Sequence, residues 1–135
     1  MPRPAVPFAP KSNVHLLPGD FWALPLSDGR FAAGRVLARQ AFGPTDRVGV
    51  IVGLLDWEGS APPTTDDIAG ARVLAWGLTR VQAISNSGGV VLGNRPLVED
   101  GLEEICLTNA VGERSSVWGW KTILNRAEAA FLSGE

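Results

Sequence analysis

The side chains that most often carry nucleophilic and general-base chemistry are scarce in this sequence. It has one histidine, His15, and one cysteine, Cys106. His15 lies in a proline-rich stretch ahead of the first expected strand, which does not suit a catalytic triad. A single cysteine and a distant single histidine are too few for a zinc site, and the glycine-rich segment 87–93 lacks the lysine of a phosphate loop. We therefore expect no catalytic residue, no metal and no cofactor.

Carboxylates are the remaining reactive groups, and they occur in three clusters. Their members are Asp56 and Glu58, then Asp66 and Asp67, then Glu99, Asp100, Glu103 and Glu104. Paired acids can serve glycoside or metal-assisted phosphoryl chemistry, but a shaped cleft would also be needed. Solvated charge is the default interpretation of such clusters, and an acidic patch that faces a protein partner is the functional one. We assign the partner-facing role to the first and third clusters.

Five tryptophans and no tyrosine are the second unusual feature. Trp57 stands between two acids where an apolar run ends, and Trp118 and Trp120 bracket a glycine. Two tryptophans at positions i and i+2 of an extended segment point to opposite sides, so burial of both needs cover on both sides. Exposed tryptophan beside acids is typical of interface hot spots, whereas core packing is the alternative for each ring. We include Trp57 and Trp118 among the candidate partner-binding residues.

The element best placed to position these groups is a hairpin in residues 18–40. Alternating apolar residues occupy 21–26 and 31–40, and between them lies the Asp28-Gly29 pair that favours a two-residue turn. That turn would place Leu26 opposite Phe31, Leu24 opposite Ala33 and Trp22 opposite Arg35, with the guanidinium over the indole.

The rest of the chain predicts further short strands and one helix. Strands are expected at 48–57, at 72–76, at 90–93 and at 102–109, with loops between them. From 120 onward the spacing becomes helical, with apolar residues at Trp120, Ile123, Leu124, Ala127 and Phe131. This order predicts a mainly β, α+β fold: a strongly bent antiparallel sheet or open SH3-like barrel with a C-terminal helix.

Composition bounds the organisation and the cellular setting. The length of 135 residues fits one globular domain at 18–135, preceded by a proline-rich arm at 1–17. A formal net charge of −2 does not favour nucleic acid as a direct partner. The lone cysteine favours a reducing compartment, and no apolar run resembles a signal peptide or membrane span, so a cytoplasmic protein is expected.

The hairpin resembles the opening motif of the immunity protein 26 family of bacterial polymorphic toxin systems. In that motif a Gly-Asp pair precedes an aromatic-apolar strand, a Leu-x-Asp-Gly turn follows, and the return strand carries Gly-x-Val. The matching positions here are Gly19, Asp20, Leu26, Asp28, Gly29, Gly34 and Val36. The resemblance implies a small cytoplasmic protein that binds and neutralises a cognate toxin, with these residues shaping the scaffold. Because hairpins of this kind also recur in SH3-like barrels, other functions stay open.

Two alternatives to an immunity protein follow from the residues. An SH3-like endoribonuclease would use hairpin arginines such as Arg30 and Arg35 on RNA. A structural or assembly subunit would use the N-terminal arm to contact its neighbours, and either a monomer or a homodimer is compatible with the sequence. Our principal hypothesis is a non-enzymatic immunity protein.

Overall fold

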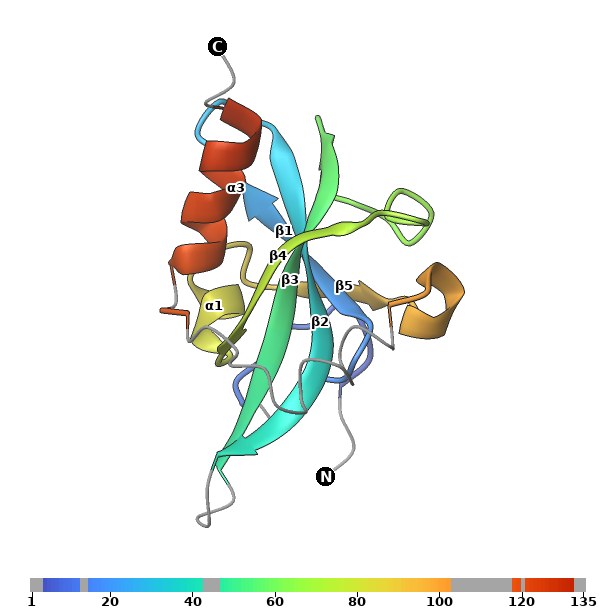
Figure 1. Cartoon of the computed structure of the whole chain (residues 1–135), viewed down its shortest axis with the longest axis vertical. Helices are drawn as coiled ribbons and strands as arrows, with labels where there is room; N and C mark the ends of the chain where they lie inside the picture. Colours follow the sequence, from blue (N-terminus) through green and yellow to red (C-terminus); the bar gives the residue numbers. More distant parts are fainter. Residues whose placement is uncertain (1–3, 13–14, 43–46, 103–117, 120, 133–135) are drawn as a thin grey trace.

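The computed structural model describes residues 4–12, 15–42, 47–102, 118–119 and 121–132, and its centre is a five-stranded antiparallel sheet. The strand order across the sheet is β4-β3-β2-β1-β5. The strands are β1 (Asp20–Pro25), β2 (Phe31–Phe42), β3 (Arg47–Gly59), β4 (Val73–Thr79) and β5 (Val91–Asn94). The helical elements are α1 (Gln82–Ser85), the 3-10 helix η3 (Leu97–Asp100) and α3 (Thr122–Leu132). The expected mainly β architecture with a C-terminal helix is confirmed, and the sheet stays open rather than closing into a barrel (Figure 1).

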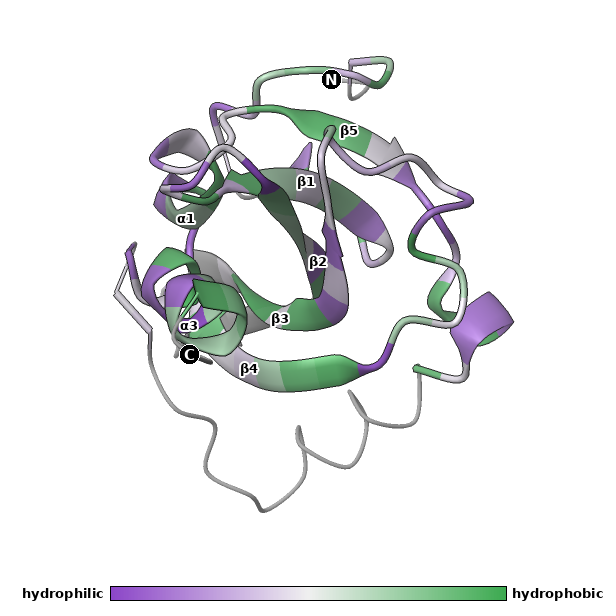
Figure 2. Ribbon diagram, turned by 90° about the horizontal axis from the view of Figure 1, so that it is seen from above, coloured by the Kyte–Doolittle hydropathy of each residue, from purple (hydrophilic) through white to green (hydrophobic). Residues whose placement is uncertain are grey.

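The sheet is strongly bent, and its curvature has local causes. The pairing register shifts within β2 between Ala32 and Gly34 and between Val36 and Ala38. Such bulges bend a strand and increase its twist. Gly34 also has a packing reason, because a Cβ built there would lie 2.6 Å from the Trp22 ring. Seen from above, the strands curve around an open side at which α1 and α3 lie (Figure 2).

The hairpin forms where expected, but the predicted register was wrong by one residue. The Leu26 N–H donates to the Arg30 carbonyl, and the Gly29 N–H donates to the Leu26 carbonyl. The loop therefore contains three residues, with Gly29 in the left-handed region at φ 93°. Trp22 consequently pairs with Gly34, and Arg35 pairs with Phe21. A one-residue slip moves side chains to the other face, so Arg35 does not stack on Trp22 as predicted.

The concave face of the sheet carries the main core. Trp22, Leu24 and Leu54 are buried there with Ile123 and Ala127 of α3, which confirms the predicted helix and its apolar side. The proline-rich arm joins this core, because Phe8 is buried and exchanges two backbone hydrogen bonds with Val91 of β5.

Two loop segments cover the other face of the sheet. One is the segment that contains η3, from which Leu97 and Leu102 pack against Leu37 of β2. Ile68, from the loop between β3 and β4, packs against Phe21 and the rest of a smaller cluster. Both faces of the centre of the sheet are therefore buried from solvent. A polar side chain on the convex face of β2 meets these loops instead of water.

The strands expected from sequence differ at their ends. The strand expected at 72–76 is β4, which continues through Thr79, and the strand expected at 90–93 is β5. The strand expected at 102–109 lies almost wholly outside the described residues, as do Trp120 and Cys106.

Candidate functional site

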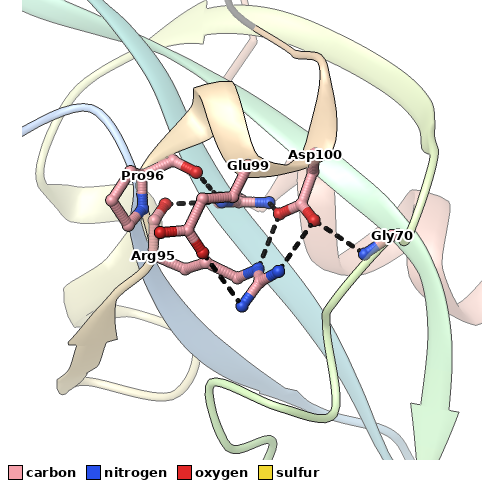
Figure 3. Close-up of polar contacts among 6 residues, drawn as sticks. Gly70, Arg95, Pro96, Glu99 and Asp100 are labelled. Atoms are coloured by element: carbon pink, nitrogen blue, oxygen red, sulfur yellow. Dashed lines mark hydrogen bonds and ion pairs between the residues drawn. The ribbon is translucent and has the colours of Figure 1, made fainter.

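A buried ionic cluster joins the two outer-face loops to the sheet. It consists of Arg35 on β2, Arg95 after β5, Asp100 at the end of η3 and the backbone N–H of Gly70, and we call it the Asp100 cluster (Figure 3). The Asp100 Oδ2 accepts from Arg35 Nη1 at 2.7 Å and from Arg95 Nε at 2.8 Å. Its Oδ1 accepts from the Gly70 N–H at 2.8 Å and from Arg95 Nη2 at 3.2 Å. One carboxylate thus connects three segments that lie far apart in the sequence.

Arg35 is the innermost member of the cluster. Its side chain is 0% exposed and that of Asp100 is 1% exposed. Besides the carboxylate, the Arg35 guanidinium donates through Nη2 to the main-chain carbonyls of Arg95 and Pro96, while its Nε has no partner. A buried charge is costly unless it is paired and hydrogen-bonded, and here a carboxylate and two carbonyls accept from both terminal nitrogens of the guanidinium.

The contacts of the cluster shift the pKa values of Asp100 and Arg95. Burial by itself raises the pKa of Asp100, but hydrogen bonds from Arg95, Gly70 and Arg35 outweigh it and lower that pKa to about 2. The hydrogen bond with Asp100 raises the pKa of Arg95, and the nearby charges of Glu99 and Asp66 act in the same direction. Asp100 is therefore ionised and Arg95 protonated at neutral pH.

Exposed carboxylates lie on the two loops that the cluster joins. Glu99 is exposed and its Oε1 lies 3.3 Å from Arg95 Nη1. Asp66 and Asp67 are also exposed, on a turn closed by reciprocal bonds between Thr64 and Asp67: Asp67 Oδ2 accepts from the Thr64 N–H, and Thr64 Oγ1 accepts from the Asp67 N–H. The bond from the Gly70 N–H to Asp100, together with the electrostatic effect of Asp66 on Arg95, places the turn that carries Asp66 and Asp67 close to the segment that carries Glu99 and Asp100.

The other candidate partner-binding residues lie in several places. Asp56 and Glu58 are exposed near the end of β3, where Asp56 pairs with Arg72 and Glu58 with Arg30. Trp57 is half-buried, and its ring lies so close to Gly59 that a Cβ there would be 2.7 Å away. Glu103 and Glu104 lie outside the described residues.

Two of the candidates are not at the surface. Trp118, a candidate partner-binding residue for which core packing was the alternative, is 6% exposed, and its ring lies against Gly77 of β4, as core packing predicts. Asp100 was expected among solvent-facing acids, but Arg35 and Arg95 enclose its carboxylate. Nothing local distinguishes Asp100 from Glu99 in the sequence; their difference arises because the loop folds back onto β2.

The residues of the hairpin motif have structural tasks. Asp20 accepts from the Leu17 N–H at 2.9 Å and from the Asn94 side chain at 2.9 Å, which ties the start of β1 to β5. Gly19, at φ 97°, lies against the Arg95 carbonyl, where an added Cβ would be only 2.6 Å from the oxygen. Because that carbonyl accepts from Arg35, the motif glycine leaves space for the Asp100 cluster.

The described residues also bear on other chemistry. Among them, no group of three or more His, Cys, Asp or Glu side chains could hold a metal ion. Within the same ranges, no helix combines the length and apolar character needed to cross a membrane. Compared with protein-family models, with curated proteins and with solved structures, the chain matches none.

Proposed function

We propose that this chain is a non-enzymatic, cytoplasmic binding protein that neutralises a cognate bacterial protein toxin. The observation that carries the proposal is the fixed placement of exposed acids over the Asp100 cluster. Asp66 and Asp67 on one loop and Glu99 on the other are attached to a shared, buried ionic centre. We call these three residues the acidic face.

An acidic face on an ordered backbone suits a basic protein surface. Complementary charge accelerates encounter between proteins, and a binding surface that is already ordered loses less conformational entropy on association. Many toxins that act on nucleic acids have basic clefts, which such a face would fit. The hairpin motif supports the same class of function through its resemblance to an immunity family, while its own residues serve the scaffold.

The alternatives receive less support from the described residues. An endoribonuclease that uses Arg35 on RNA would need that side chain in contact with solvent, but it is wholly buried. An assembly subunit would extend its N-terminal arm to a neighbour, yet Phe8 in that arm pairs with β5 of its own chain.

The experiment that tests the proposal is capture followed by neutralisation. The tagged protein is used to capture partners from lysate of its host, in parallel with an Asp66→Asn, Asp67→Asn, Glu99→Gln variant. A control carries Asp28→Asn and Glu128→Gln, which remove two acidic charges at the hairpin end. The captured protein is then expressed alone and with each form, and growth is recorded.

We expect a basic toxin that the wild type and the control neutralise and the acidic-face variant does not. Capture of RNA, or of copies of the same chain alone, would overturn the proposal in favour of a ribonuclease or an assembly subunit. Equal neutralisation by all three forms would leave a toxin-binding protein but reject the acidic face as its surface.

A further inference from the structure

Within the part of the chain that the structure describes, the two loops of the acidic face share few hydrogen bonds. Within the turn, the Ala69 and Ala71 N–H groups bond to the carbonyls of Asp66 and Ile68, so these bonds are local. The bond from the Gly70 N–H to Asp100 connects this turn to the η3 segment. Ile68 also anchors the turn, but it packs on the sheet rather than on η3.

We propose that Asp100 is a positioning residue for partner binding. Its carboxylate, buried beneath the surface, holds the turn at 64–70 and the segment at 95–101 in one arrangement. The acids of both loops then meet a basic protein surface together, although Asp100 itself contacts no partner. This inference rests on the proposed function for its biological meaning, whereas its physical content concerns the isolated protein.

The geometry favours positioning over a purely stabilising role. A carboxylate that only neutralised Arg35 would need one oxygen, but Asp100 uses Oδ2 for Arg35 and Oδ1 for the Gly70 N–H. Arg95 bonds to both oxygens and extends to Glu99, so the orientation of the carboxylate is fixed relative to the exposed acid. Movement of the turn would break the charge-assisted bond from the exposed Gly70 to Asp100, and movement of the η3 segment would also break the more deeply placed bond from Arg35. Charge-assisted hydrogen bonds are among the stronger polar interactions in proteins.

Hydrogen exchange of the Gly70 amide tests the proposal directly. In an Asp100→Asn variant we expect this amide to exchange about tenfold to a hundredfold faster, as loss of a hydrogen bond to a charged group implies. The Ala71 amide, whose acceptor is local, serves as an internal reference. A Glu99→Gln variant is the matched control, because it removes the neighbouring exposed acid and leaves the Gly70 bond in place.

A second variant separates positioning from general stability. In the double variant Arg35→Met, Asp100→Leu, apolar side chains replace the buried pair, and such replacements are often tolerated. Positioning predicts that Gly70 still exchanges faster while amides of β2 and β3 keep their wild-type protection. The proposal is overturned if Gly70 stays protected in both variants, or if the sheet amides and Gly70 accelerate equally in the double variant.

These outcomes do not depend on finding a toxin. If Gly70 responds as expected but capture yields no toxin, the proposed function fails and the structural role of Asp100 stands. If a toxin is captured and neutralised while Gly70 exchange is unaffected, the proposed function stands and the positioning role of Asp100 fails.

Discussion

Two groups of this protein pair an arginine with carboxylates and main-chain carbonyls, one at the surface and one in the interior. At the hairpin end, Arg30 contacts Asp28 and Glu58 and donates to the carbonyl of Phe131 in α3. In the Asp100 cluster, Arg35 contacts a carboxylate and likewise donates to main-chain carbonyls. The side chains of Arg30 and Glu58 are 37% and 38% exposed, whereas those of Arg35 and Asp100 are 0% and 1% exposed.

The difference teaches what burial does to an ion pair. At the surface, water stabilises the separated charges almost as well as the pair does, so the pair contributes little. In the interior the separated charges have no such alternative, and loss of one partner leaves the other unsatisfied. The hairpin group is therefore expected to contribute little to stability, whereas the Asp100 cluster holds the two outer-face loops against the sheet.

The largest expected effect is that of removing Arg35. An Arg35→Met variant leaves the buried Asp100 carboxylate with one fewer cation, and we expect a loss of about 3–5 kcal/mol in the free energy of unfolding. Urea denaturation followed by tryptophan fluorescence measures this loss. A change below about 1 kcal/mol would show that the two ion pairs are energetically alike and would break the comparison.

The next effect is the acid sensitivity of the Asp100 cluster. Since the folded-state pKa of Asp100 is about 2 and its ordinary value is 3.8, the carboxylate contributes stability above pH 4 that is lost as the pH falls through 2. At 1.36 kcal/mol per pKa unit, this contribution amounts to about 2 kcal/mol. Carbon NMR of the Asp100 carboxyl group gives the midpoint directly, and unfolding curves between pH 2 and pH 5 give the stability. An Asp100→Asn variant should lack this portion of the pH dependence. If the Asp100 carboxyl group of the wild type titrated near 3.8, the predicted acid sensitivity would be contradicted.

The smallest effect is expected at the hairpin end. An Arg30→Met variant, matched in chemistry to Arg35→Met, should lower the free energy of unfolding by less than about 1 kcal/mol, as measured for exposed pairs. What effect there is should decrease at high salt, because exposed charges are screened. Denaturation in low and high salt tests both points. A loss as large as that of Arg35→Met would show that the contact between Arg30 and α3 matters more than its exposure suggests.

Local sequence patterns predicted which strands and helix form better than they predicted the pairing register between the strands. The alternation in 21–40 and the Asp-Gly pair identified the hairpin, and helical spacing identified α3. The turn pair is compatible with a two-residue or a three-residue loop, because glycine adopts positive φ at low cost in both. The choice between them depends on packing, since the observed register places Gly34 beneath the Trp22 ring and sends Arg35 to the other face.

The candidate site was predictable only in part, and for a similar reason. Clustered acids suggested a charged surface, and Glu99, Asp66 and Asp67 are indeed exposed. The proximity of the two loops was not visible in the sequence, because contact between distant segments leaves no local periodicity. Trp118 was equally ambiguous, since the glycine it covers belongs to β4, some forty residues earlier in the chain.

By itself the sequence determined the approximate positions of the five described strands and of α3, the antiparallel hairpin, and the scarcity of groups for nucleophilic or metal chemistry. These depend on residue type and on short-range spacing, which φ and ψ preferences and apolar periodicity translate directly into local structure. Only the tertiary structure decided that Asp100 is buried beneath exposed acids and that Arg35 meets it. Whether a charged side chain lies in water or in the interior depends on what the rest of the chain places over it, and here two loops separated by some thirty residues cover the same strand.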